Sequence, residues 1–138
     1  MRLIPHYEAT ADARALVEAI PGSGCERGIA ISPRTPTAAI EGLLADLEQV
    51  TVMLIEPGKG GQQMMPALLD KVRELRARIS ALGLATRIEV DGGVKAHNIG
   101  SCALAGVDIA VAGSAVFNEA QTPAEALAAL HGALAALE

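Results

Sequence analysis

The sequence predicts an α/β fold with a parallel sheet, and three observations lead to this prediction. Five short apolar segments typical of buried strands alternate with helical segments along the 138 residues. No linker or shift in composition divides the chain. Several strand segments end in glycine-rich turns. We therefore expect one domain, residues 1–138, built on a parallel sheet that is either open and doubly wound or part of a (β/α) barrel.

Composition and charge exclude several classes of function. The chain is 51% apolar with 1% aromatic residues, and its net charge is −5, which argues against a nucleic-acid partner. No apolar run is long enough to span a bilayer and the start lacks a signal-peptide pattern, so we expect no membrane partner and a cytoplasmic location. Cys25 and Cys102 match no metal or redox spacing and are expected to be reduced thiols.

Hydrophobic periodicity places five strand–helix units in order. The predicted strands are residues 3–9, 28–32, 50–55, 87–91 and 107–112. The predicted helices are residues 12–20, 36–47, 66–82, 95–104 and 122–138. Asp12 lies near the first helix start, and Thr35 is expected to cap the second helix, with Pro36 at its first position. Thr122 and Glu125 form a capping-box pattern for the last helix.

Three consecutive strand ends carry similar chemistry. The segments are Gly58, Lys59, Gly60 and Gly61 after the third strand, Asp91, Gly92 and Gly93 after the fourth, and Gly113 and Ser114 after the fifth. In a parallel sheet these ends share one rim, where bare backbone N–H groups and a hydroxyl bind phosphate. Asp-Gly is also a common turn dipeptide, so Asp91 alone does not decide the function. Neither the Walker pattern nor the Gly-x-Gly-x-x-Gly dinucleotide pattern follows a strand.

Five short motifs extend this pattern over nearly the whole chain. They are His-Tyr-Glu-Ala at residues 6–9, Pro-Arg-Thr-Pro at 33–36, Met-Leu-Ile-Glu-Pro-Gly-Lys-Gly-Gly-Gln at 53–62, Val-Asp-Gly-Gly at 90–93 and Ala-Gly-Ser-Ala-Val-Phe at 112–117. In this order they make the chain similar to the ribulose-phosphate 3-epimerase family. The resemblance implies a parallel (β/α) TIM barrel of the ribulose-phosphate-binding type. It also implies an isomerase that inverts C3 of a ketopentose 5-phosphate, converting ribulose 5-phosphate to xylulose 5-phosphate.

The resemblance also implies roles for single residues. The family's phosphate contacts map onto residues 58–61, Gly92, Gly93, Gly113 and Ser114. Its acid–base aspartate, which also binds a divalent metal cation of the Zn, Fe, Mn or Co class, maps onto Asp91. Lys59 stands where the family usually has an aromatic residue. We expect its ammonium to be solvated and its backbone N–H to contact the phosphate.

The chain corresponds to about five of the eight βα units of such a barrel, so the predicted barrel is incomplete. The family's partner aspartate, metal histidines and substrate-binding serine lie on its first three strands, for which we find no counterpart here. We therefore expect a homo-oligomer or a missing N-terminal segment. The alternatives to an active epimerase are a phosphosugar-binding fragment without catalysis and a half-barrel assembly module.

Other titratable residues offer little to replace the missing groups. His97 and His131 are predicted to lie in helices, away from the rim, and His6 is expected to be a packing histidine. Glu8 and Glu56 are the obvious carboxylates near the rim that would replace the second base.

Overall fold

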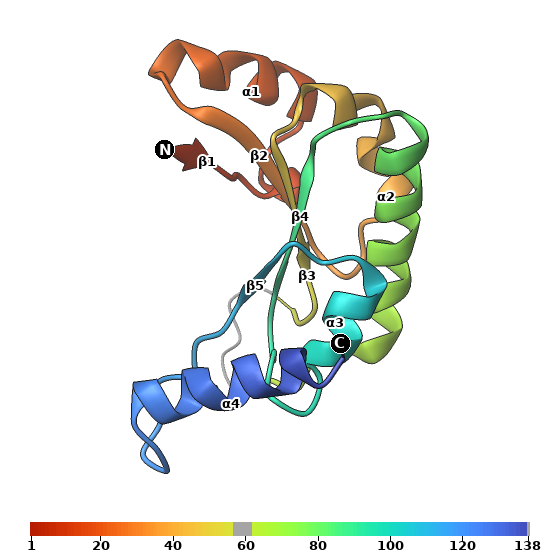
Figure 1. Ribbon diagram of the computed structural model, residues 1–138. Coiled ribbons are helices and arrows are strands. Elements are labelled where there is room, and N and C mark those ends of the chain that lie inside the picture. The colour runs from red at the N-terminus through yellow and green to blue at the C-terminus, as the bar shows by residue number, and fades with distance from the viewer. Residues whose placement is uncertain (57–61, 138) are drawn as a thin grey trace.

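A single five-stranded parallel sheet organises the molecule. The computed structural model describes residues 1–56 and 62–137, and Figure 1 shows the strands in the order β1-β2-β3-β4-β5. The strands are β1 (Arg2–Leu3), β2 (Glu26–Ile31), β3 (Gln49–Met53), β4 (Arg87–Asp91) and β5 (Ile109–Val111). Each strand pairs in parallel with the next strand along the chain. This is the strand order of a (β/α) barrel and not of a doubly wound sheet, in which the order reverses.

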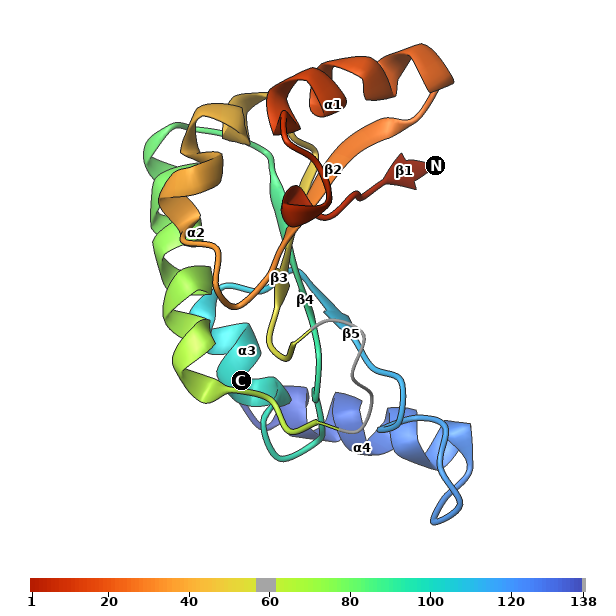
Figure 2. The same ribbon diagram turned by 180° about the vertical axis from the view of Figure 1, so that it is seen from behind.

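Helices connect the strands. The α-helices are α1 (Ala13–Ala19), α2 (Leu69–Ala81), α3 (Ile99–Ala105) and α4 (Pro123–Ala135). The 3₁₀ helices are η1 (Tyr7–Ala9), η2 (Ile20–Ser23), η3 (Thr37–Asp46) and η4 (Pro66–Leu68). Helices α2 and α3 lie along one face of the curled sheet, and none of the described helices covers the other face between β1 and β5 (Figures 1 and 2). Within the described residues the sheet is therefore a half-barrel with its helices on one face.

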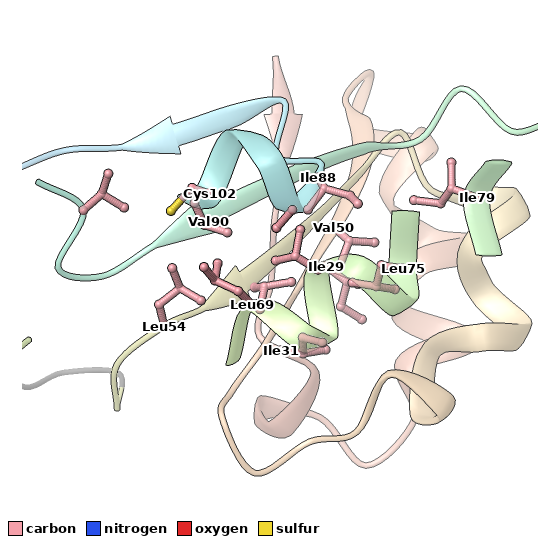
Figure 3. Packing of buried hydrophobic residues seen from close by; sticks show 14 of the residues in the cluster. Ile29, Ile31, Val50, Leu54, Leu69, Leu75, Ile79, Ile88, Val90 and Cys102 are labelled. Carbon is pink, nitrogen blue, oxygen red and sulfur yellow. The ribbon is translucent and has the colours of Figure 1, made fainter. Parts of the chain in front are cut away.

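The hydrophobic core lies between the sheet and its helices. Ile29, Val50 and Ile88 are fully buried and lie on the helix-facing side of β2, β3 and β4, where they pack with Leu75 and Ile79 of α2 (Figure 3). Burying each such side chain contributes about 1.5–3 kcal/mol to folding. This layer fixes which face of each strand turns inward.

The opposite face of the sheet carries polar side chains. Arg2 Nη1 donates to Gln49 Oε1 at 2.6 Å, Gln49 Nε2 to Thr51 Oγ1 at 3.2 Å, and Thr51 Oγ1 to Glu89 Oε1 at 2.9 Å. This chain of hydrogen bonds crosses from β1 to β4 on the inner side of the half-barrel. Asp91, two residues beyond Glu89, lies on the same face of β4.

The predicted strand over residues 3–9 is wrong in its second half. Only Arg2 and Leu3 form β1, and the chain then turns into η1. The reason is Glu8, whose carboxylate accepts from the Ser32 backbone N–H at 2.6 Å and from the Thr35 hydroxyl. The predicted cap is wrong as well, because the Thr35 hydroxyl donates to Glu8. The helix η3 begins at Thr37, so Pro36 is its N-cap residue and not its first residue, and no side chain caps it.

Most other element predictions are confirmed. The Asp12 side chain accepts from Ala15 N at the start of α1, and Thr122 and Glu125 form the expected capping box of α4. The helix predicted over residues 95–104 begins only at Ile99, because the preceding residues form a hydrogen-bonded turn.

The sheet does not close into a barrel within the described residues. Strands β1 and β5 each pair on one side only, with β2 and β4. The predicted incomplete barrel is thereby confirmed, and its two edges present unpaired backbone groups.

Candidate functional site

The carboxyl ends of the last three strands lie side by side. Met53 of β3 is in register with Asp91 of β4, and Asp91 is in register with Val111 of β5. The loops that follow these strands therefore start from one edge of the sheet. This is the edge where parallel α/β folds hold their ligands.

A pocket of about 390 Å³ lies among these loops. Its lining residues are Gln62, Gln63, Met64, Pro66, Gly93, Lys95, His97, Asn98 and Ser114. They come from the segment after β3, the loop between β4 and α3, and the segment after β5. The pocket thus brings together segments that are up to about fifty residues apart in the chain.

The loop between β4 and α3 is held by Asn98. Its Oδ1 accepts from the Lys95 backbone N–H at 2.8 Å, and its Nδ2 donates to the Gly93 carbonyl at 3.0 Å. Gly93 has a φ of +66°, a conformation that a glycine adopts without strain. These contacts fix the backbone that forms one wall of the pocket.

Lys95 connects the β4 loop to the β5 loop. Its Nζ donates to Ser114 Oγ at 3.0 Å. Among residues 1–56 and 62–137, no carboxylate forms an ion pair with Lys95. Sequence reasoning missed Lys95. It matched Asn98 to the family pattern that follows the Asp-Gly-Gly turn but gave it no role.

Asp91 comes two residues before Gly93, which lines this pocket, and is itself not among the lining residues. It is the half-buried last residue of β4, and its backbone carbonyl accepts from Leu54 N at 2.8 Å. No hydrogen bond or ion pair to its carboxylate occurs within the described part of the chain. Its carboxylate on the inner face is therefore available to a ligand.

The predicted phosphate residues fall into three groups. Gly93 and Ser114 line the pocket. Gly92 and Gly113 are next to them without lining it, and a Cβ on Gly92 would lie 2.5 Å from Ile55 Cγ1. Gly58, Lys59, Gly60 and Gly61 lie outside the described residues. A role of any of them in binding phosphate stays a prediction.

The predicted position of His97, in a helix and away from the rim, is wrong, although the side chain is exposed at the surface. His97 lies in the turn before α3 and lines the pocket at the rim. The Asn98 side chain hydrogen-bonds to the backbone of Lys95 and Gly93, so this segment forms a turn and α3 begins only at Ile99. Hydrophobic periodicity does not reveal these hydrogen bonds. His131 is exposed on α4, and His6 forms a parallel bridge with Ala30.

Glu8 and Glu56 are both engaged in structural contacts. Partial burial alone would raise the pKa of Glu8, but the hydrogen bonds from Thr35 and from the Ser32 backbone outweigh it, so the pKa lies below its ordinary value. A carboxylate held in its charged form in this way is a poor proton acceptor. Glu56 lies 3.7 Å from the Arg34 guanidinium.

The described residues do not form a metal site by themselves. They contain no group of three or more His, Cys, Asp or Glu side chains placed to hold an ion. Asp91 alone is too small a donor set for a divalent cation. Burial raises the pKa of the Cys102 thiol, whose sulfur lies 3.8 Å from the Met64 sulfur, so this cysteine remains a protonated, packed thiol.

Within the described ranges, no helix is both long and apolar enough to cross a bilayer.

The curled parallel sheet and its pocket at the carboxyl edge define an incomplete (β/α) barrel. Residues 1–117 match the Ribulose-phosphate 3 epimerase family, and the chain belongs to that family. It is similar to the ribulose-phosphate 3-epimerase of Escherichia coli K12, with 42% identity over 114 residues, 83% of this chain and 51% of the relative. The enzyme of the same name from Mycobacterium bovis is 41% identical over 125 residues, 91% of this chain and 54% of the relative.

A solved structure supports the same architecture. The crystal structure of a 3-hexulose-6-phosphate synthase superposes with a TM-score of 0.61 at 25% identity, over 86% of this chain and 54% of that chain. The chain thus spans about half the length of the relatives that it matches.

Proposed function

We propose that this chain provides the phosphate-binding part and one acid–base carboxylate of an epimerase that acts at C3 of ribulose 5-phosphate. The observation that carries the proposal is the pocket that Gly93 and Ser114 share next to Asp91. Family membership supports the substrate class, because the relatives carry the name of this enzyme.

The phosphate is proposed to bind where the loops after β4 and β5 meet. The Gly93 backbone and the Ser114 hydroxyl line the pocket, and Gly92, Gly113 and residues 58–61 are proposed to add contacts. Backbone N–H groups and a hydroxyl favour an anion without requiring a positively charged protein. The net charge of −5 is therefore compatible with a phosphorylated sugar.

The sugar is proposed to extend from this pocket over the inner face of the sheet. C3 of the sugar is two carbons from the phosphorylated C5. Asp91 lies on that face, two residues before Gly93, and its carboxylate is available. Asp91 is thus proposed to remove and return the C3 proton on one side of the enediolate.

Inversion requires a second acid–base group on the other side of the sugar. Of the carboxylates near the inner face, Glu8 is held by Ser32 and Thr35, and Glu89 accepts from Thr51. The second group and any further metal ligands beside Asp91 are therefore proposed to come from another segment or another chain. The proton step assigned here involves Asp91 alone.

A second candidate function is a half-barrel module that binds phosphosugar or assembles without catalysing epimerisation alone. The observation that favours it is the open sheet, with edge strands β1 and β5 and with Leu3 and Val111 exposed by 41% and 38%. Unpaired strand edges with exposed apolar side chains favour association with a further chain, including a second copy.

Proton exchange separates these functions. Ribulose 5-phosphate and a divalent metal are added to the protein in heavy water, and loss of the C3 proton signal is followed by NMR. Exchange that disappears in Asp91→Asn supports the epimerase. Binding of inorganic phosphate without exchange supports the binding fragment, and light scattering reports whether this species is an oligomer. Absence of both binding and exchange rejects the phosphate proposal.

A further inference from the structure

We propose that Lys95 is a specificity residue that, through its charge and its bond to Ser114, selects dianionic phosphate esters over monoanionic ligands. This inference rests on the proposed phosphate site. It assigns to the pocket a cationic group that neither the family motifs quoted above nor the glycine pattern indicates.

The hydrogen bond between Lys95 and Ser114 has a defined direction. An ammonium group has three donors and no acceptor, so at 3.0 Å the Ser114 oxygen must be the acceptor. The hydroxyl proton of Ser114 is then directed away from Lys95. Lys95 thus orients Ser114 as a donor for an anion in the pocket that both residues line.

The ammonium of Lys95 keeps two further N–H donors. The part of the chain that the structure describes offers no carboxylate partner for it. The two remaining ammonium N–H groups and the Ser114 hydroxyl are therefore left to donate to an anion in the pocket that both residues line. A phosphate monoester dianion has oxygens that accept from these donors and a negative charge that pairs with the Lys95 ammonium.

The backbone of Lys95 is held on both sides. Its N–H donates to Asn98 Oδ1 at 2.8 Å, and its carbonyl accepts from Ile99 N at 2.9 Å. Only the side chain must therefore be ordered when a ligand binds. This reduces the entropy cost of using a flexible lysine at the site.

Charge is what distinguishes Lys95 from the rest of the pocket lining. Among the described lining residues it is the one lysine or arginine, and the lining contains no aspartate or glutamate. Backbone N–H groups and hydroxyls contribute dipoles, which distinguish a singly from a doubly charged anion less strongly than a full charge does. Lys95 is therefore the group expected to respond to the second charge of phosphate.

The test compares inorganic phosphate at pH 8, where it is mainly the dianion, with a monoanionic phosphodiester such as dimethyl phosphate. Binding of each anion to the wild-type chain and to variants is measured by calorimetry at two salt concentrations. The variants are Lys95→Met, Lys95→Arg, Ser114→Ala and the double variant. Arg73→Met is the matched control, because it removes one positive charge from the exposed surface of α2, where Arg73 pairs with Asp70.

We expect Lys95→Met to weaken phosphate binding by about tenfold, as for loss of a charged hydrogen bond. Its salt dependence should also decrease, and the preference for phosphate over dimethyl phosphate should shrink. Lys95→Arg should retain most of the affinity, and Arg73→Met should match the wild type. Ser114→Ala should cost less in the Lys95→Met background than alone, since the hydroxyl is no longer oriented.

Several results would overturn the assignment. Lys95→Met binding within twofold of the wild type, with a native thermal melt, rejects Lys95 and leaves the proposed function intact. An equal loss in Arg73→Met shows an effect of net charge alone. Phosphate binding that is lost equally in Lys95→Met and Lys95→Arg, with the folded state intact in both, rejects selection by charge. A wild-type chain that binds no phosphate removes this inference together with the phosphate site.

Discussion

Gly93 lies against the main chain of Met64, so that a Cβ on Gly93 would be 2.3 Å from the Met64 backbone nitrogen. The φ of Gly93 is +66°, which a residue with a side chain rarely adopts. The loops that follow β3 and β4 thus touch through their backbones. This contact forms part of the pocket wall, and it requires glycine.

Gly93→Ala should therefore be strongly destabilising. The added methyl group meets backbone and not a flexible side chain, so we expect a loss of about 2 kcal/mol or more in the free energy of unfolding. Denaturant unfolding measures it. Gly132→Ala is the control, because Gly132 is exposed within α4 with nothing near its Cβ, and it should gain about 0.5–1 kcal/mol. Equal effects of the two changes would contradict this account of the loop.

The Glu8 contacts predict an acid-sensitive N-terminal region. Because the folded-state pKa of Glu8 is lowered, its contribution to stability is fully present above the ordinary glutamate pKa and is lost as the pH falls through the folded value. The loss should thus occur below about pH 4. Glu8→Gln should reduce stability at pH 7 by about 1 kcal/mol and flatten the acid limb of the stability curve. An acid limb as steep as that of the wild type would argue against Glu8.

Asp108 should be important for stability, because it serves two partners. Its Oδ2 accepts from the Ile88 backbone N–H at 2.8 Å and from Arg76, which also donates to the Gly106 carbonyl. Asp108→Ala should cost about 1–3 kcal/mol, since the Ile88 N–H then loses its acceptor. Asp70→Ala removes an exposed pair with Arg73 and should cost less than about 0.5 kcal/mol. Chemical unfolding of both variants measures the two losses in the free energy of unfolding. A loss in Asp70→Ala as large as that in Asp108→Ala would contradict the role given to Asp108.

Asp91→Asn should separate chemistry from binding. The substitution keeps the shape of the side chain but removes the carboxylate that accepts the proton. We expect proton exchange at C3 to be abolished and phosphate affinity to stay within about twofold, because Asp91 does not line the pocket. Exchange and calorimetric titration are measured on the same preparation. Exchange at the wild-type rate in the variant would remove Asp91 from the proposed role.

The fold was largely predictable because it depends on hydrophobic periodicity. The sequence predicted a strand from the alternation at Ile88 and Val90, and a helix from the apolar stripe that includes Leu75 and Ile79. All four residues are buried. The end of β1 could not be predicted from the sequence. The turn that follows it depends on the hydrogen bond from the Thr35 hydroxyl to the Glu8 carboxylate, and no local pattern reveals a contact across 27 positions.

The site was predictable where backbone chemistry determines it. The glycine at position 93 and the hydroxyl at 114 were identified from turn composition, and both line the pocket. Lys95 and His97 were missed because their placement depends on the Asn98 side chain holding the loop. A side-chain-stabilised turn of this kind looks like the start of a helix in sequence.

The central claim is that the loops after β4 and β5 form one phosphate site, and an NMR titration of ¹⁵N-labelled protein with inorganic phosphate tests it most directly. We expect the largest amide shifts to cluster at Gly93, Lys95 and Ser114 and to saturate with a single dissociation constant. Shifts that scatter over the surface, or that concentrate at the separate pocket between η3 and α2 near Thr37 and Arg78, would contradict the account.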